Sequence, residues 1–156
     1  MKNYRWIILI ALCLCQVMLS QQLLQLPDES KRPSLVVQPQ ILVFSPNEIR
    51  EKTILLYNTN TRSAISWTVS YSRFIKVQSD LPNPLQPLSG GYLRVSILWN
   101  LVDSEIIRIE NPDVLHTLIS KIFGIDLPSK PLGFGMIAIG EKNSLSVHTV
   151  MVIVVK

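Results

Sequence analysis

Lys52-Thr53-Ile54-Leu55-Leu56-Tyr57-Asn58 and Ile65-Ser66-Trp67-Thr68-Val69 are two apolar stretches separated by a polar turn. In the second stretch the large apolar residues alternate, so one face of a strand carries all of them. Asn58 ends the first stretch, where its amide can hydrogen-bond the backbone of the turn. The two stretches therefore predict two β-strands, the second with its apolar face directed inward.

The same pattern of short apolar runs and turn residues continues on both sides of these stretches. Strands at this spacing, with no helix alternating between them, favour an antiparallel β-sandwich over residues 35–156. The runs are rich in Val, Ile, Leu and aromatic residues, as strands are. They predict strands over Leu35–Val37, Ile41–Phe44, Thr53–Tyr57, Ile65–Tyr71, Phe74–Val77, Tyr92–Trp99, Gly135–Ile139 and Ser146–Val155.

One inserted segment has helical rather than strand periodicity. Asn111 suits an N-cap, Pro112 suits the first helical position, and Gly124 suits the end of a helix. The apolar residues between them recur at helical spacing, which predicts a helix over residues 112–123. Its apolar face has two interpretations: it covers an open end of the sandwich, or it docks a partner.

The last predicted strand is apolar on both of its faces. Val147, Met151 and Ile153 lie on one face, and Val150 and Val152 lie on the other. Such a strand is either buried within the domain or paired with a partner strand. Burial is the favoured interpretation, because an exposed apolar edge promotes aggregation.

Residues 1–20 have the pattern of a secretory signal peptide or a retained signal anchor. Lys2 and Arg5 precede an apolar run that continues to Leu19. Cleavage after Cys13, Cys15 or Ser20 would each leave a small residue at the cut, and retention would instead anchor the domain in a membrane. We expect a polar linker over residues 21–34 and entry into the secretory pathway, with an extracellular, periplasmic or membrane-anchored destination.

Composition argues against several functional classes. Removing Lys2 and Arg5 from the 15 basic residues leaves 13 against 11 acidic ones, a balance that does not suggest a nucleic-acid binder. With two His and two Cys in 156 residues, we expect no metal site and no cofactor. Acidic residues do come in close pairs, but a role at a helix terminus is favoured for Asp113, and no convergent catalytic site is evident. We therefore expect no enzymatic activity.

Residues 37–98, read as one block, resemble the major sperm protein (MSP) domain, a member of the PapD-like group of immunoglobulin-type sandwiches. The resemblance rests on a proline before an apolar strand that ends in Phe, a strand that ends in Asn, and a strand of the type Ile-Gly-Trp. A Pro-rich stretch, a Leu-x-Pro turn and a further apolar strand follow. These elements are Val37-Gln38-Pro39, Leu42-Val43-Phe44, Thr53–Asn58, Ile65-Ser66-Trp67-Thr68-Val69, Leu85-Gln86-Pro87 and Leu93–Ile97. The resemblance implies an immunoglobulin-like antiparallel sandwich, to which the helix predicted over residues 112–123 is an insertion that departs from the family pattern.

The resemblance also implies a structural or protein-interaction function, with self-association into a homodimer. In relatives that bind acidic peptides, a lysine-rich run follows the strand that matches Ile65–Tyr71. This chain has no lysine there, but Arg73 and Lys76 lie nearby and are candidate partner-binding residues. Two alternatives remain: a secreted or periplasmic chaperone module that pairs an exposed strand with a client, and a membrane-tethered adaptor that binds a peptide motif.

Overall fold

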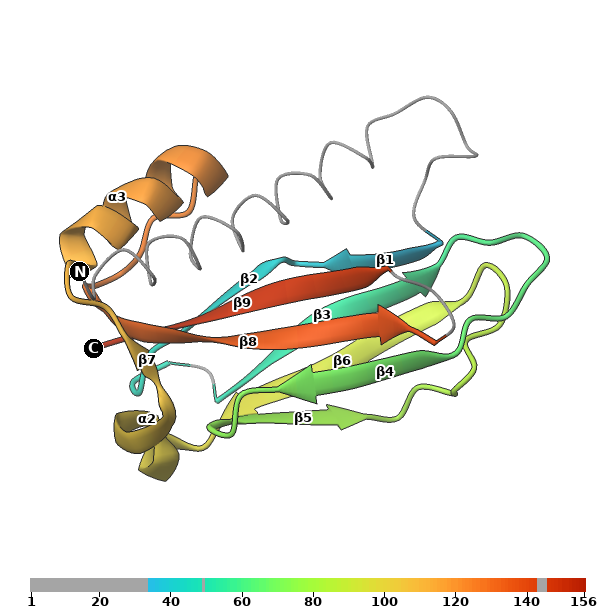
Figure 1. Cartoon of the computed structure of the whole chain (residues 1–156), viewed down its shortest axis with the longest axis horizontal. Coiled ribbons are helices and arrows are strands. Elements are labelled where there is room, and N and C mark those ends of the chain that lie inside the picture. Colours follow the sequence, from blue (N-terminus) through green and yellow to red (C-terminus); the bar gives the residue numbers. More distant parts are fainter. Residues whose placement is uncertain (1–33, 49, 143–145) are drawn as a thin grey trace, which may run out of the picture.

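The computed structural model describes residues 34–48, 50–142 and 146–156, which form a sandwich of two β-sheets (Figure 1). Sheet 1 has the strand order β1-β3-β6-β5, with β1 Leu35–Gln38, β3 Glu51–Asn58, β6 Gly90–Ile97 and β5 Ile75–Ser79. Sheet 2 has the order β2-β9-β8-β4, with β2 Ile41–Phe44, β9 Val147–Val155, β8 Pro131–Glu141 and β4 Trp67–Tyr71. The short β7, Ile107–Arg108, also pairs with β8. The predicted signal or anchor over residues 1–20, and the predicted linker up to residue 33, lie outside the described residues.

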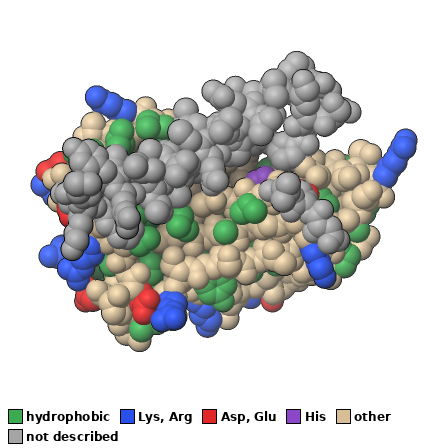
Figure 2. Space-filling view, viewed as in Figure 1, with side chains coloured by type: hydrophobic (Ala, Val, Ile, Leu, Met, Phe, Trp, Pro, Cys, Tyr) green, Lys and Arg blue, Asp and Glu red, His purple; other side chains and the backbone are tan. Residues whose placement is uncertain are grey.

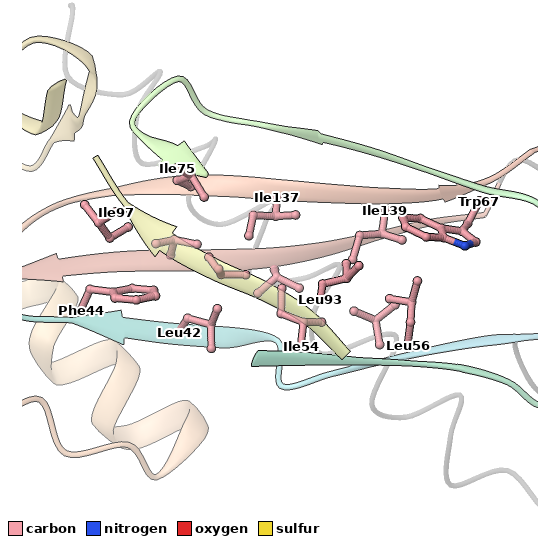
Figure 3. Close-up of a cluster of buried hydrophobic side chains, with 14 of the residues drawn as sticks. Leu42, Phe44, Ile54, Leu56, Trp67, Ile75, Leu93, Ile97, Ile137 and Ile139 are labelled. Carbon is pink, nitrogen blue, oxygen red and sulfur yellow. The ribbon is translucent and has the colours of Figure 1, made fainter. Parts of the chain in front are cut away.

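The main core lies between the two sheets (Figure 3). Each strand except β7 contributes alternate side chains to it, as the pleat of a strand requires. Leu56 of sheet 1 and Ile137 of sheet 2 are fully buried, and the predicted inward face of Ile65, Trp67 and Val69 contributes to the same core. The two-sheet sandwich expected from the sequence is therefore confirmed.

Strand β9 is paired on both sides, so the prediction that it is buried is confirmed. It lies between β2 and β8 in sheet 2. Its pairing with β8 is antiparallel, but its pairing with β2 is parallel, with Ile41 opposite Met151. The expectation of a wholly antiparallel sandwich was wrong at this position. The chain passes from sheet 1 to sheet 2 between β1 and β2 without reversing direction, and this places β2 parallel to the last strand.

A second core lies on the outer face of sheet 2, under helix α3, Pro112–Phe123. Leu115 and Ile119 of the helix are buried against Met151 and Ile153 of β9. The bounds of the helix are those predicted, and Gly124 ends it in the left-handed conformation, with a φ of 64°. The helix covers its own domain, as favoured, but it covers a sheet face and not an open end of the sandwich.

Two predicted strand ends need correction around the inserted region. Trp99, expected to end a strand, instead begins helix α2, Trp99–Glu105, which the sequence pattern did not predict. Strand β8 extends well beyond the predicted Gly135–Ile139 and includes glycines that are weak strand formers. These glycines are needed for close contacts, because a Cβ on Gly135 would collide with the ring of Phe74, and one on Gly133 with the carbonyl oxygen of Ile107.

Asn58 is a fully buried polar residue that holds one end of the sandwich together. Its side-chain Nδ2 lies 2.9 Å from the carbonyl oxygen of Ser63, 3.1 Å from that of Leu85 and 3.0 Å from that of Gln86. Its Oδ1 accepts a hydrogen bond of 2.9 Å from the backbone N–H of Asn60. The side chain thus joins the turn after β3 to the proline-rich loop before β6, which confirms the predicted bonding of Asn58 to turn backbone.

Val150→Asp is expected to destabilise the domain by at least about 3 kcal/mol, because it places an unpaired carboxylate in the core between the sheets. Val150 is 0% exposed, whereas Val147 on the same strand is 59% exposed. Val147→Asp is therefore the matched control, with an expected change within about 0.5 kcal/mol. Urea unfolding followed by tryptophan fluorescence measures both variants, and equal losses in the two would contradict the burial of β9.

Asn58→Ala is expected to cost about 2–3 kcal/mol, because it removes the hydrogen bonds of a fully buried side chain, among them those to the Ser63 carbonyl oxygen and the Asn60 N–H. Asn111→Ala is the control, because the side chain of Asn111 makes no capping hydrogen bond at the start of α3. Thermal unfolding of both variants by circular dichroism tests the difference. A similar melting temperature for the two would show that the Asn58 amide does not join the loops.

Candidate interaction surface

The outer face of sheet 1 is the candidate site, because α3 covers the outer face of the other sheet. Alternation along β6 turns Leu93 and Val95 into the core and leaves Tyr92 and Arg94 on the outer face. In the paired strand β3, Leu55 lies opposite Tyr92 and Thr53 lies opposite Arg94. A row of polar and aromatic side chains therefore crosses the centre of this face.

Arg94 is the centre of a charged network on this face. Its Nη2 lies 2.7 Å from Oδ2 of Asp80, and its Nε lies 3.7 Å from Oε1 of Glu51. Asp80 directly follows β5, and Glu51 begins β3, so the network joins both strands that flank β6. These pairs are exposed, so each adds little stability. They do hold the guanidinium in place beside Tyr92.

Tyr92 and Arg94 line a shallow pocket on this face. The pocket has a volume of about 490 Å³, and its other lining residues are Thr53, Asp80 and Leu81. The side chain of Tyr92 is 61% exposed. Tyrosine and arginine are among the residue types that contribute most to protein–protein binding, since each combines apolar contact area with hydrogen bonding.

Leu88 adds an exposed apolar residue near the end of the same face. Its φ is 52°, in the left-handed region that a leucine rarely adopts, and its side chain is 55% exposed. Its carbonyl oxygen accepts a hydrogen bond of 3.1 Å from the hydroxyl of Tyr57, and its N–H donates one of 3.1 Å to Asn60. Neither its conformation nor its exposure is favourable for folding, which marks Leu88 as a candidate binding residue.

The predicted site residues Arg73 and Lys76 lie on adjoining parts of the chain. Arg73 is in the turn between β4 and β5, and its Nη1 lies 3.8 Å from Oε1 of Glu105 in α2. Figure 2 shows basic and acidic side chains close together at the end of the molecule where α2 lies, so this end is not a purely basic patch. Lys76 is exposed on β5, on the outer face of sheet 1 and opposite Ser96. An acidic-peptide site at these two residues stays a prediction.

Sequence reasoning did not identify Tyr92, Arg94, Asp80 or Leu88 as site residues. Tyr92 and Arg94 were assigned only to a strand. The single signal in the sequence was an alternation that places a tyrosine and an arginine on the polar face of β6. It could not show that Asp80 and Glu51, from two other strands, lie beside them.

His148, on β9, lies near a carboxylate at one end of the sandwich. Burial lowers the pKa of His148 below its ordinary value of 6.5, and the Glu141 carboxylate opposes this shift. Oε2 of Glu141 accepts a hydrogen bond of 3.3 Å from the Ser34 hydroxyl, and Ser146 Oγ lies 3.5 Å from Nε2 of His148. The sequence indicated neither contact. The arrangement favours a neutral imidazole in the folded protein.

Two further properties concern metals and membranes. Within residues 34–48, 50–142 and 146–156, no group of three or more His, Cys, Asp or Glu side chains could hold a metal ion. Over the same ranges, no helix combines the length and apolar character needed to cross a bilayer.

No protein-family model and no curated protein matches this sequence. Among solved structures, the chain is similar to the periplasmic chaperone SfaE, with a TM-score of 0.48 and 7% sequence identity. The match covers 77% of this chain and 56% of the chaperone chain, so this chain spans just over half of that length. At this score and identity the likeness assigns neither an activity nor a partner.

The folded domain is expected to lose stability as the pH falls below about 6.5. The unfolded chain protonates His148 near its ordinary pKa of 6.5, whereas burial lowers the pKa in the folded domain. The unfolded state therefore binds more protons below that pH, so acid favours unfolding until the folded-state pKa is passed. Melting temperatures at pH 7.5 and 5.5 measure the loss. It should be smaller in His148→Gln and unchanged in the control His116→Gln, and an equal loss in all three proteins would exclude His148 as its source.

Proposed function

We propose that this chain is a non-enzymatic protein-interaction module that binds a protein partner through the outer face of sheet 1. The observation that carries the proposal is Tyr92, 61% exposed, beside an arginine held between two carboxylates. This is the chemistry of a binding surface, because an aromatic anchor buries area and a fixed guanidinium adds directional hydrogen bonds. Leu88 extends the surface with an exposed apolar contact.

We also propose that the domain is a member of the MSP family. The sequence block that resembles the family ends β2 with Phe44, ends β3 with Asn58 and begins β4 with Trp67. Its Pro-rich stretch forms the loop between β5 and β6. This arrangement supports the resemblance, and a role in protein binding agrees with it.

The alternative of a chaperone that donates its last strand gains no support from the pairing of β9, because β2 and β8 occupy both of its edges. The alternative of a membrane-tethered adaptor depends on retention of residues 1–20. In both a secreted and a tethered form, the outer face of sheet 1 would be the binding surface. The secretory route stays part of this proposal.

Replacing Tyr92 with a photo-crosslinking phenylalanine analogue tests the proposed surface in cells that express the full chain. A discrete crosslinked product, identified by mass spectrometry, is expected for position 92. Tyr71 is the matched control, since it is a tyrosine 46% exposed at the end of a strand in the other sheet. Absence of a product at position 92, or the same products at both positions, would contradict the proposal.

A further inference from the structure

We propose that two copies of this chain pair through β5, in antiparallel orientation, to extend sheet 1 into one continuous sheet across a dimer. This inference concerns the edge of sheet 1 and does not rest on partner binding by its outer face. The observations that carry it are the position of β5, the direction of its backbone groups and the order of its charges.

Strand β5 is the last strand of sheet 1 and pairs with β6 on one side only (Figure 1). The backbone N–H of Leu98 donates to the carbonyl oxygen of Phe74 over 2.8 Å, which makes these two residues a hydrogen-bonded pair. In an antiparallel ladder such pairs alternate, so Lys76 and Gln78 bond to β6. The backbone groups of Val77 and Ser79 therefore point away from β6, toward the open edge.

Strand β4 forms the other open edge on this side of the sandwich, and a side chain caps the backbone groups of its first residue. Trp67 of the edge strand β4 donates its backbone N–H to Oδ1 of Asn83 over 3.2 Å. Its carbonyl oxygen accepts a hydrogen bond of 2.8 Å from Nδ2 of the same asparagine. The Asn83 amide thus takes the place of a neighbouring strand at Trp67. At β5 the feature on the edge is instead a charged residue, Lys76.

A lysine on an edge strand usually opposes pairing with another chain. Here the same face also carries Asp80, whose carboxylate contacts Arg94 on the outer face and is 85% exposed. If two β5 strands pair antiparallel about Gln78, Lys76 of each copy lies directly opposite Asp80 of the other. Opposite charges in such cross-strand positions stabilise a sheet. The charge order therefore selects a second copy of this chain as the occupant of the edge.

The same register also agrees with the direction of the backbone groups. It places Val77 opposite Ser79 of the other copy, so residues whose N–H and C=O groups face the open edge meet each other. Gln78 then lies opposite Gln78 of the other copy, in a pair without backbone hydrogen bonds. Cα atoms in such pairs are about 4.5 Å apart, which is within the range that a disulfide can bridge.

Disulfide crosslinking tests the contact directly. In the full chain with Cys13 and Cys15 replaced by serine, Gln78→Cys is expected to yield a covalent dimer under mild oxidation, seen on non-reducing gels. Ser70→Cys is the control, because Ser70 is exposed on β4 in the other sheet. No more dimer from Gln78→Cys than from Ser70→Cys would overturn the proposal.

Charge exchange tests the register. Sedimentation equilibrium of the full chain should show a dimer whose dissociation constant rises about tenfold in Lys76→Glu, since both symmetric ion pairs become repulsive. The double variant Lys76→Glu/Asp80→Lys restores the opposite charges between the copies and should recover part of the affinity, because the new lysine also lies beside Arg94 in its own copy. Arg73→Glu makes the same charge change in the adjacent turn and should have no effect.

A monomer at all concentrations, or a dimer insensitive to Lys76→Glu, would overturn the proposed pairing. These outcomes are separate from those for the binding surface. Dimerisation through β5 without a crosslinked partner at position 92 would support the pairing and contradict the proposed function. A crosslinked partner at position 92 without dimerisation through β5 would support the binding surface and contradict the pairing.

Discussion

Strand β9 is apolar on both faces, and the rest of the architecture follows from the need to cover both of them. Its even-numbered valines face sheet 1, and its odd-numbered residues Met151, Ile153 and Val155 face α3. Burial of apolar side chains is the main source of stability in a domain of this size. A second sheet alone could cover only one face, so the inserted helix supplies the third layer. One sheet face then remains without a helix over it among the described residues, and this is the outer face of sheet 1.

Polar groups and glycines make this close packing compatible with the backbone. Asn58, at a position with 0% exposure, donates to carbonyl oxygens of two loops and so joins them. Gly133 and Gly135 weaken β8 as a strand but allow β7 and the ring of Phe74 to approach it. Local propensity is overridden at these points because tertiary contacts are worth more than the strand preference of one residue.

The surface of sheet 1 separates into a face and an edge with different chemistry. On the face, Tyr92 and Arg94 present an aromatic ring and a fixed cation, which suit a protein partner. At the edge, Lys76 and Asp80 present opposite charges on the same face, four residues apart. This spacing suits an identical strand running in the opposite direction. Lys76 was a candidate binding residue from the sequence alone, but as part of an acidic-peptide site and not as one half of a self-complementary pair.

Local patterns in the sequence determined most of the strands, both ends of helix α3 and the burial of the last strand, because periodicity and capping residues depend only on neighbours along the chain. Tertiary structure decided the parallel pairing of β2 with β9, the position of α3 on a sheet face, and the presence of α2. It also brought Glu51, Asp80, Tyr92 and Arg94 together from separate strands. Which strands become neighbours depends on how the whole chain buries its apolar faces, and the pattern within any one strand does not contain that information.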